Sequence, residues 1–332
     1  MIAVISNESG EPSTSDVINW ISYLGHDSLL LYGEDFGRHF NVNIAFLGKN
    51  ELASFELHGK VYTPDDISII WYRRDRTYFP ESLNDISNDT NREKVKRLVF
   101  NEVNVLRSHF YALLKDKKWL SDPKKSLVNK LDVLKEAASV GLKIPETLVT
   151  TSKSSLIDFF QRHNKNVIIK PMSETLFYAI NDRQYSLATH LLTDLEVESM
   201  PETFFPCLVQ ECVVNSFEIR VFYLEGKCYS IAVFHNQNID QQFDNRIGYL
   251  DHHKSCYQLP KHIETSIDML LKNLQMETGS LDFIRTPEGE FVFLEVNPVG
   301  QFSGMVSYPG NYYLEKKIAQ YLIRKSNEEK SI

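Results

Sequence analysis

The chain has 332 residues, 42% of them hydrophobic and 24% charged, so it is long enough for two or three units that each bury a core. The net charge of −8 excludes nucleic acid as the main partner, because phosphate binding needs a concentrated basic surface. No apolar run approaches the about 20 residues that a membrane-spanning helix needs. The amino end also lacks the features of a signal peptide, and the four cysteines show no paired spacing. We therefore expect a cytoplasmic protein with reduced thiols and no membrane partner.

The first part of the chain has the pattern of an α/β domain. Residues 1–32 contain an apolar strand, a helix that we expect to begin at Asp16, and a second apolar strand. Residues 94–118 carry apolar side chains at three- and four-residue spacing, which predicts a long amphipathic helix. This helix closes the N-terminal domain that we place at residues 1–120.

Two further units follow, which we place at residues 121–206 and 207–325, with a polar tail at 326–332. A helix is predicted from Asp122 to Gly141, and Lys130 lies beside its apolar stripe. The stripe that we expect to be buried consists of Leu127, Leu131, Leu134 and Ala138. A short apolar strand then ends at Lys170.

Two hairpins are predicted in the last unit. The first joins Phe217–Leu224 to Lys227–Phe234 through Glu225-Gly226, and a helix follows it from Leu259-Pro260. The second hairpin covers residues 281–297, and its turn is expected between Glu288 and Gly289.

The second hairpin places Asp282 directly opposite Glu295. Like charges at such a pair repel one another, so a cation is expected between them. Asn297 lies two residues beyond Glu295 and therefore on the same face. Three oxygen ligands on one face predict a Mg²⁺ site that shares its metal with substrate phosphates. The alternative is a surface hairpin whose two acids point into solvent.

Several cationic side chains could serve such a site. Lys130 and Lys170 suit triphosphate oxygens, although a lysine is most often a solvated surface group. Strand alternation puts Glu218 and Arg220 on one face, which fits either a functional pair or an ion pair on a solvated sheet. Arg246 is equally ambiguous by itself.

A further pair of arginines, Arg73 and Arg74, follows the apolar run 69–72. Open α/β sheets place their ligands at strand ends, so this pair is a candidate for receiving an acidic substrate. The alternative is a structural ion pair with Asp66 or Asp75.

The chain contains no Walker A motif and no dinucleotide-binding glycine motif. Six short motifs nevertheless occur in the order found in the ATP-grasp fold, and together they resemble that superfamily: Asn129-Lys130, Ile169-Lys170-Pro171, Val209–Val213, Glu218–Phe222, Asp282-Phe283 and Glu295–Pro298. Within it, the chain looks like the RimK-like maturases of graspetides, of microviridin type, and most like the maturase of grasp-with-spasm systems. The resemblance implies an ATP-grasp fold preceded by a Rossmann-like domain.

The resemblance also implies roles for individual residues. ATP would contact the two lysines and the hinge segment, namely Lys130, Lys170, Gln210, Glu211, Cys212 and Val213. Mg²⁺ would be held by Asp282, Glu295 and Asn297, and the catalytic residues would be Arg220, Arg246 and Glu218. One departure from the pattern is the segment 172–183, which lacks the glycines of the usual phosphate-covering loop.

The implied activity is ATP-dependent ligation with release of ADP and phosphate. A precursor peptide with a leader and an acidic and hydroxylic core would be joined through ω-ester or ω-amide bonds, and a homodimer is left open. Two alternatives are a RimK-like ligase that adds amino acids to a carboxylate and a non-catalytic ATP-binding protein. The residues alone do not separate the first two activities.

Overall fold

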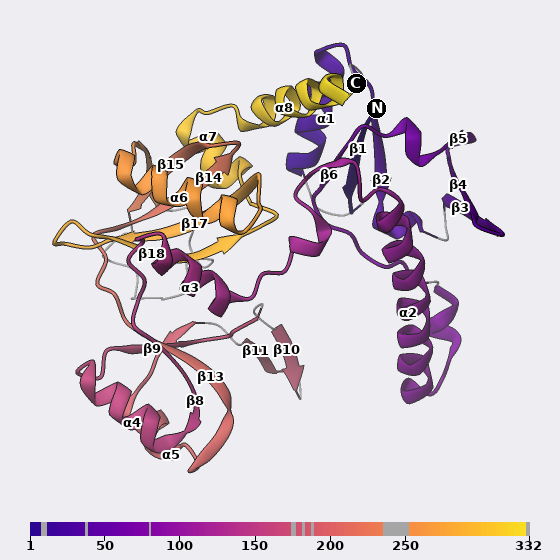
Figure 1. Ribbon diagram of the computed structural model, residues 1–332. Coiled ribbons are helices and arrows are strands. Elements are labelled where there is room, and N and C mark those ends of the chain that lie inside the picture. Colours follow the sequence, from indigo (N-terminus) through magenta and orange to yellow (C-terminus); the bar gives the residue numbers. More distant parts are fainter. Residues whose placement is uncertain are drawn as a thin grey trace. The chain divides into compact units, whose positions relative to one another are not determined.

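The computed structural model describes residues 1–7, 12–36, 39–79, 81–173, 177–180, 183–186, 189–234 and 252–329. The chain divides into two compact units, one formed by Met1–Ser126 with Tyr313–Ile332 and the other by Leu127–Tyr312 (Figure 1). Helices and sheets are mixed in both units, as the predicted α/β class requires.

The first unit is built around a four-stranded parallel sheet. In spatial order its strands are β2 (Ser28–Tyr32), β1 (Ile2–Ser6), β6 (Ile69–Tyr72) and β7 (Lys118–Leu120). All residues of β1 and β6 are buried, which explains why their sequences are nearly continuous apolar runs.

A smaller antiparallel sheet and three long helices complete the first unit. The sheet consists of β3 (Phe40–Leu47), β4 (Asn50–Leu57) and β5 (Lys60–Tyr62). Short 3₁₀ turns occupy Gly33–Asp35, Pro64–Asp66 and Glu81–Asp85. The helices are α1 (Pro12–Tyr23), α2 (Asp89–Leu113) and α8 (Leu314–Glu329), and α1 packs against α8.

The ends of these helices differ from the sequence prediction. The first helix begins at Pro12 rather than Asp16, because the fixed φ of proline suits the first helical position. Helix α2 begins at Asp89, where the side chain of Asn88 accepts a hydrogen bond from the backbone of Asn91. We expected a polar tail from residue 326, whereas α8 continues through Glu329 and buries Ser326. This last helix lies in the first unit, so that unit is discontinuous in sequence.

The second unit contains two antiparallel sheets and a separate hairpin. The first sheet has the order β12 (His190–Leu191), β9 (Val167–Lys170), β13 (Thr203–Glu211) and β8 (Thr147–Ser152). Helices α4 (Lys153–Arg162) and α5 (Asp194–Ser199) bury their apolar side chains against this sheet. The hairpin pairs β10 (Phe177–Ile180) with β11 (Arg183–Ser186).

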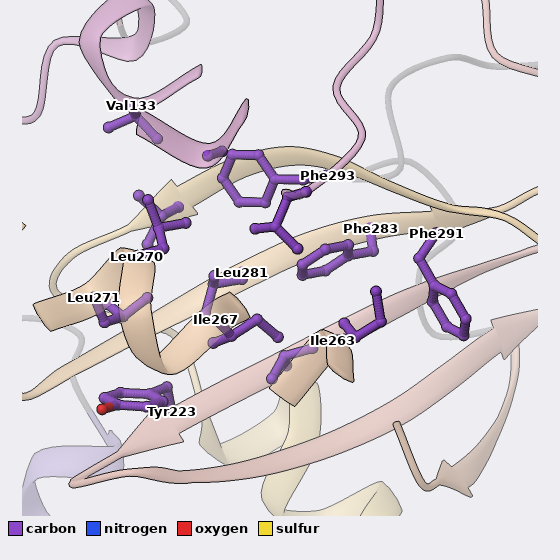
Figure 2. Packing of buried hydrophobic residues seen from close by; sticks show 14 of the residues in the cluster. Val133, Tyr223, Ile263, Ile267, Leu270, Leu271, Leu281, Phe283, Phe291 and Phe293 are labelled. Carbon is purple, nitrogen blue, oxygen red and sulfur yellow. The ribbon is translucent and has the colours of Figure 1, made fainter. Parts of the chain in front are cut away.

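The second sheet of this unit has five strands. In spatial order they are β16 (His253–Tyr257), β15 (Lys227–Phe234), β14 (Phe217–Leu224), β17 (Thr278–Arg285) and β18 (Phe291–Asn297). One face packs against α3 (Lys130–Ser139) and α6 (Lys261–Asn273), and Figure 2 shows the resulting core. A short π-helix, Ser303–Ser307, and α7 (Tyr308–Gly310) follow β18.

The first predicted hairpin of this unit is confirmed. Leu224 pairs with Lys227, and the two turn residues, Glu225 and Gly226, both have positive φ, at 46° and 80°. This geometry is that of a two-residue turn whose twist matches its strands. The predicted helix start is likewise confirmed, since α6 begins at Lys261 with Pro260 as its N-cap.

The helix predicted from Asp122 to Gly141 was wrong in its start and its buried face. Asp122 caps only a 3₁₀ turn, Pro123–Lys125, and the α-helix begins at Lys130 with Asn129 as its N-cap. Leu127 is 77% exposed, and the buried residues of α3 are Val133, Leu134 and Ala137. The later start makes Lys130 the first residue of the helix rather than a residue on its flank.

None of the helices in the described parts of the chain is long and apolar enough to cross a membrane.

The core of the second unit should be sensitive to cavities. Ile267 of α6 is fully buried in the cluster of Figure 2, whereas Met269 on the same helix is 47% exposed. We expect Ile267→Ala to lower the free energy of unfolding by about 2–5 kcal/mol, because the cavity adds to the lost burial. Met269→Ala should change it by no more than about 0.5 kcal/mol. Urea unfolding of both variants measures the difference, and equal effects would contradict the assigned packing.

Candidate functional site

The β17–β18 hairpin brings two carboxylates together. Asp282 pairs directly with Glu295, as predicted, and Ser280 pairs with Asn297. The next pair is Phe283 with Phe293, so β18 contains one extra residue, Leu294, at this point. Such a bulge bends and twists a strand and is common beside active sites. The predicted pair is therefore right, although the regular register we assumed does not continue to the turn.

The three proposed metal ligands differ in exposure. Asp282 is 9% exposed, the Glu295 side chain is 33% exposed, and Asn297 is exposed. Along this strand pair, exposure therefore increases from Asp282 through Glu295 to Asn297. No cluster of three acidic, histidine or cysteine side chains suited to a metal occurs in the described residues. A Mg²⁺ site does not require such a cluster, because Mg²⁺ usually binds one or two carboxylates together with waters and substrate phosphates.

Arg220 lies between two carboxylates on β14. It pairs across the sheet with Asp282, and its guanidinium contacts the Asp282 carboxylate. A second guanidinium nitrogen lies 3.1 Å from the Glu218 carboxylate. The side chains of Glu218, Arg220 and Asp282 are only 9%, 15% and 12% exposed, which excludes the alternative of an ion pair on a solvated sheet.

The electrostatics of Asp282 reflect this crowding. Burial raises the pKa of the Asp282 carboxyl, Arg220 lowers it, and the Glu295 carboxylate raises it again. The Glu218 and Asp282 carboxylates therefore share the single guanidinium of Arg220. A cation beside Glu295 would relieve the repulsion between Asp282 and Glu295, since it places positive charge next to both carboxylates.

Two lysines from other elements lie at the same place. The Lys130 ammonium is 3.6 Å from the Glu295 carboxylate, and it is held there by the first turn of α3. Lys170 ends β9, and burial lowers its pKa to about 8, while Glu295 raises that pKa and Lys130 lowers it. The structure thus gathers Lys130, Lys170, Asp282 and Glu295 from four separate elements. This arrangement has the charges needed to hold a polyphosphate and its metal.

The proposed hinge segment lies at the end of β13. Gln210 is buried and pairs with both neighbouring strands, and its Nε2 donates to Thr147 Oγ1 at 2.7 Å. The Glu211 carboxylate accepts a hydrogen bond from the Glu146 backbone N–H at 3.0 Å. This bond fixes the Glu211 side chain beside the start of β8. Cys212 donates its backbone N–H to Asn166 at 2.8 Å. Val213, the next residue, is partly exposed.

The two arginines after β6 have different surroundings within the first unit. Arg73 is 2% exposed, its backbone N–H donates to Ile5, and its guanidinium lies 5.3 Å from the ring centre of Trp71. Arg74 is exposed. Of this pair, therefore, only Arg74 is exposed to solvent.

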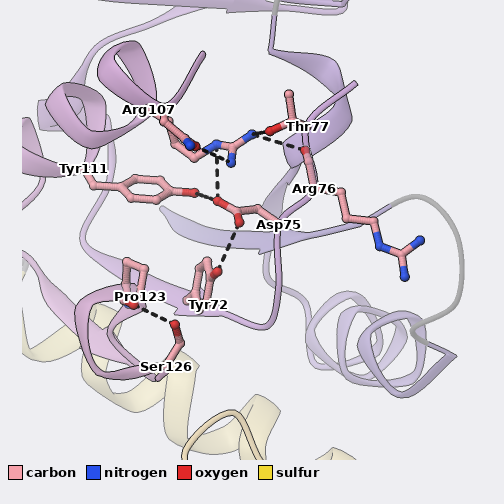
Figure 3. A network of polar contacts seen from close by, with 9 residues as sticks. Tyr72, Asp75, Arg76, Thr77, Arg107, Tyr111, Pro123 and Ser126 are labelled. Atoms are coloured by element: carbon pink, nitrogen blue, oxygen red, sulfur yellow. Dashed lines mark hydrogen bonds and ion pairs between the residues drawn. The ribbon is translucent and has the colours of Figure 1, made fainter. Parts of the chain in front are cut away.

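The loop after β6 is anchored by a buried network that the sequence analysis missed (Figure 3). Asp75 accepts hydrogen bonds from Tyr111 at 2.7 Å and Tyr72 at 3.2 Å, and its carboxylate lies 3.3 Å from Arg107. Burial and the Asp75 carboxylate raise the pKa of both tyrosines, so both hydroxyls remain donors. Arg107 also donates to the backbone oxygen of Arg76. An arginine among the apolar positions of a predicted helix was the available signal.

A glycine permits the close packing of this loop. A Cβ added at Gly33 would lie 2.6 Å from the backbone nitrogen of Arg76 and from the Asp75 Cβ. No side chain fits there without moving the loop.

Arg246 and part of the glycine-free segment 172–183 lie outside the described residues. The described part of that segment includes strand β10.

Comparison with known proteins identifies the fold. No protein-family model matches the chain, and no curated protein matches it. Among solved structures, the macrocyclase MdnC from Microcystis aeruginosa MRC, bound to precursor peptide MdnA, is 22% identical, with a TM-score of 0.82 over 98% of this chain and 100% of MdnC. A RiPP-associated ATP-grasp ligase from Chryseobacterium gregarium, in complex with ADP and a leader and core peptide, is 22% identical, with a TM-score of 0.85 over 98% of this chain and 96% of that one.

The ATP-grasp ligase PsnB, complexed with a phosphomimetic variant of its minimal precursor, Mg and ADP, is 15% identical. Its TM-score is 0.75 over 98% of each chain. The chain therefore has the fold of the ATP-grasp ligases, which confirms the fold predicted from the six sequence motifs.

The charge balance at Arg220 gives a stability prediction. Arg220→Ala would leave two buried carboxylates without their cation, so we expect a loss of about 3–5 kcal/mol in the free energy of unfolding. Arg220→Lys keeps the charge and should lose less. Arg162, exposed at the end of α4 and lying over the Phe159 ring, provides the control, because its removal should cost no more than about 1 kcal/mol. Thermal and urea unfolding measure these values, and a fully stable Arg220→Ala protein would refute the buried cluster.

Proposed function

We propose that the chain is an ATP-dependent, Mg²⁺-using ligase that forms ester or amide bonds within a ribosomally made precursor peptide. The observation that carries the proposal is the convergence of Lys130, Lys170, Arg220, Asp282 and Glu295 in an ATP-grasp fold. The similar structures supply the substrate class, because they include a macrocyclase bound to a precursor peptide and a ligase bound to ADP with a leader and core peptide.

The proposed reaction has two steps. A side-chain carboxylate of the peptide attacks the γ-phosphorus of ATP, which forms an acyl phosphate and releases ADP. A hydroxyl or amine of the same peptide then attacks the acyl carbon, and phosphate leaves. Lys130 and Lys170 would bind the phosphates, and Arg220 would face the negative charge that develops during transfer. Mg²⁺ bound by Asp282, Glu295 and Asn297 would neutralise phosphate charge.

The proposed nucleotide contacts differ in kind. The Glu211 carboxylate is already engaged by the Glu146 backbone, so Glu211 and Cys212 would contribute through their backbone oxygens. The buried Oε1 of Gln210 accepts no hydrogen bond from the described residues. Because this atom has almost no exposed surface, the adenine contact would come from the backbone of the Gln210–Val213 segment rather than from the Gln210 side chain.

Glu295→Gln tests the proposed chemistry and its metal together. The purified chain, ATP and Mg²⁺ are incubated with a candidate precursor peptide, to be sought as a small reading frame rich in Thr, Ser, Asp and Glu beside the gene. Loss of water from the peptide is followed by mass spectrometry. We expect turnover by the wild type and none by Glu295→Gln, because Glu295 is both a proposed metal ligand and the partner of Lys130, and the substitution removes its charge. Chelation of Mg²⁺ should have the same effect.

Glu290→Gln is the matched control, since Glu290 lies at the same hairpin, is half exposed and pairs with Lys143. It should retain turnover. A fully active Glu295→Gln enzyme would remove Glu295 from the metal site. Addition of free amino acids to the peptide, rather than loss of water, would favour the RimK-like alternative. ATP binding without any turnover would favour a non-catalytic protein.

The exposed Arg74 is the better candidate for peptide recognition. An arginine fork binds a carboxylate through two hydrogen bonds, and a lysine does not reproduce that geometry. We therefore expect Arg74→Lys to bind ATP normally but to need about 10-fold more peptide for half-maximal turnover, which corresponds to about 1.4 kcal/mol. Arg73→Lys, at the buried position, should instead lower thermal stability. Peptide titrations and melting curves separate the two effects. An unchanged peptide dependence in Arg74→Lys would rule out a role for Arg74 in peptide recognition.

A further inference from the structure

The hinge segment at the end of β13 is supported by the turn that ends helix α4. Cys212 donates its backbone N–H to the backbone oxygen of Asn166 at 2.8 Å, and Asn166 donates its own N–H to the backbone oxygen of His163 at 3.0 Å. On the other side, Glu211 donates its backbone N–H to Glu146 at 3.0 Å. The hinge backbone is thus held from two sides, by the turn after α4 and by the residue just before β8.

The turn after α4 is a Schellman motif. Lys165 donates its backbone N–H to the oxygen of Phe160 at 2.8 Å. Asn164 donates its backbone N–H to the oxygen of Gln161 at 3.0 Å, which completes the pair of hydrogen bonds that defines the motif. Asn164 has a φ of 51°, and asparagine is one of the few residues that take this conformation at a helix end. The motif ends α4 at a fixed point and thereby places His163, the C-cap residue.

The ring of His163 lies between two carboxylates. Its Nε2 is 3.2 Å from the Glu146 carboxylate, and its Nδ1 is 3.9 Å from the Glu211 carboxylate. The side chain is only 12% exposed, and its ring centre lies 4.4 Å from that of Phe159. Nε2 makes no aligned hydrogen bond with the described residues, so its attraction to Glu146 is mainly electrostatic. The ring therefore contacts the side chains of the same two residues whose backbones pair beside the hinge.

We infer that His163 is a positioning residue for nucleotide binding, which holds the Glu146 and Glu211 carboxylates together and so fixes the hinge backbone. The inference rests on the proposed function, in which the backbone of Gln210–Val213 contacts adenine. Without the ring, two carboxylates would remain close together with no polar N–H group between them, and like charges repel. The hinge would shift, and a hydrogen bond to a base edge weakens steeply as its geometry departs from the ideal.

This role predicts a loss of base selectivity rather than a general loss of nucleotide binding. Adenine and guanine differ in the donors and acceptors on their edges, so backbone groups in fixed positions distinguish them. The phosphates of either nucleotide would meet the same lysines, Lys130 and Lys170, which lie outside the contacts of the His163 ring. A displaced hinge should therefore weaken an adenine nucleotide more than a guanine nucleotide.

Calorimetric titration with ADP and with GDP, in the presence of Mg²⁺ and without peptide, tests the inference. We expect His163→Ala to weaken ADP binding about 10-fold and GDP binding by no more than about 2-fold. His163→Gln keeps an N–H donor of similar reach and should recover part of the ADP affinity. His190→Ala is the matched control, because His190 contacts Glu196 of α5 at 3.1 Å instead of the hinge carboxylates. It should bind ADP as the wild type does.

A double variant separates positioning from stability. Glu211→Gln removes one of the two carboxylates that the ring holds, so the same His163→Ala change should cost less ADP affinity in that background than in the wild type. A role in stability alone predicts two independent losses that add. Melting curves verify that each variant is folded at the temperature of the titration.

Three outcomes would overturn the inference: unchanged ADP affinity in folded His163→Ala, equal losses of ADP and GDP affinity, or full additivity with Glu211→Gln. Each of them leaves the proposed function standing. A wild type that binds no ADP would instead overturn the proposed function, and this inference with it.

Discussion

Arg220 is held inside the five-stranded sheet between Glu218 and Asp282, and the register of the sheet is what keeps it there. Neighbouring residues of the same strand, Ile219 and Val221, lie in the apolar core on the other face. A slip of one residue would exchange the two faces, placing charges in the core and aliphatic side chains beside Asp282. The hydrophobic core therefore selects the register, and the register in turn assembles the charged cluster.

The lysines reach this cluster through local features of their own elements. Asn129 caps α3 and thereby sets Lys130 at the first helical turn, within 3.6 Å of Glu295. Lys170 is the last residue of β9, a strand held between β12 and β13. The extra residue Leu294 adjusts β18 where Glu295 must face Asp282. Lys130, Lys170 and Glu295 thus depend on a helix cap, a strand end and a bulge, respectively.

In the first unit, the charged side chains around the loop after β6 are mostly buried, and Arg74 is exposed. Asp75 contacts Arg107, Tyr72 and Tyr111, and these contacts hold the loop after β6 in place. The buried Arg73 packs beside Trp71. Arg74 is left exposed on that anchored loop. Helix α2 contributes Arg107 and Tyr111 to the network near its carboxyl end, where its buried residues lie.

The sequence by itself determined the elements whose signals are local. Strand alternation and the turn residues Glu225 and Gly226 specified the first hairpin, and facing positions specified the Asp282–Glu295 pair. The motif order specified the fold. Local patterns failed where two readings fitted equally well, as at Asp122, whose capping signal starts a 3₁₀ turn rather than the helix. The buried face of α3 was also missed, because the core that selects it comes from distant strands.

Only the tertiary structure decided which charges are buried. Glu218 and Arg220 were compatible with a solvated sheet until the structure showed both side chains to be largely buried. The adjacent arginines, Arg73 and Arg74, could not be told apart in sequence, although one is buried and the other exposed. Burial depends on what packs against a residue from far along the chain, whereas caps, turns and strand alternation depend on immediate neighbours. This difference in range is the physical reason why the elements followed from the sequence and the electrostatics of the site did not.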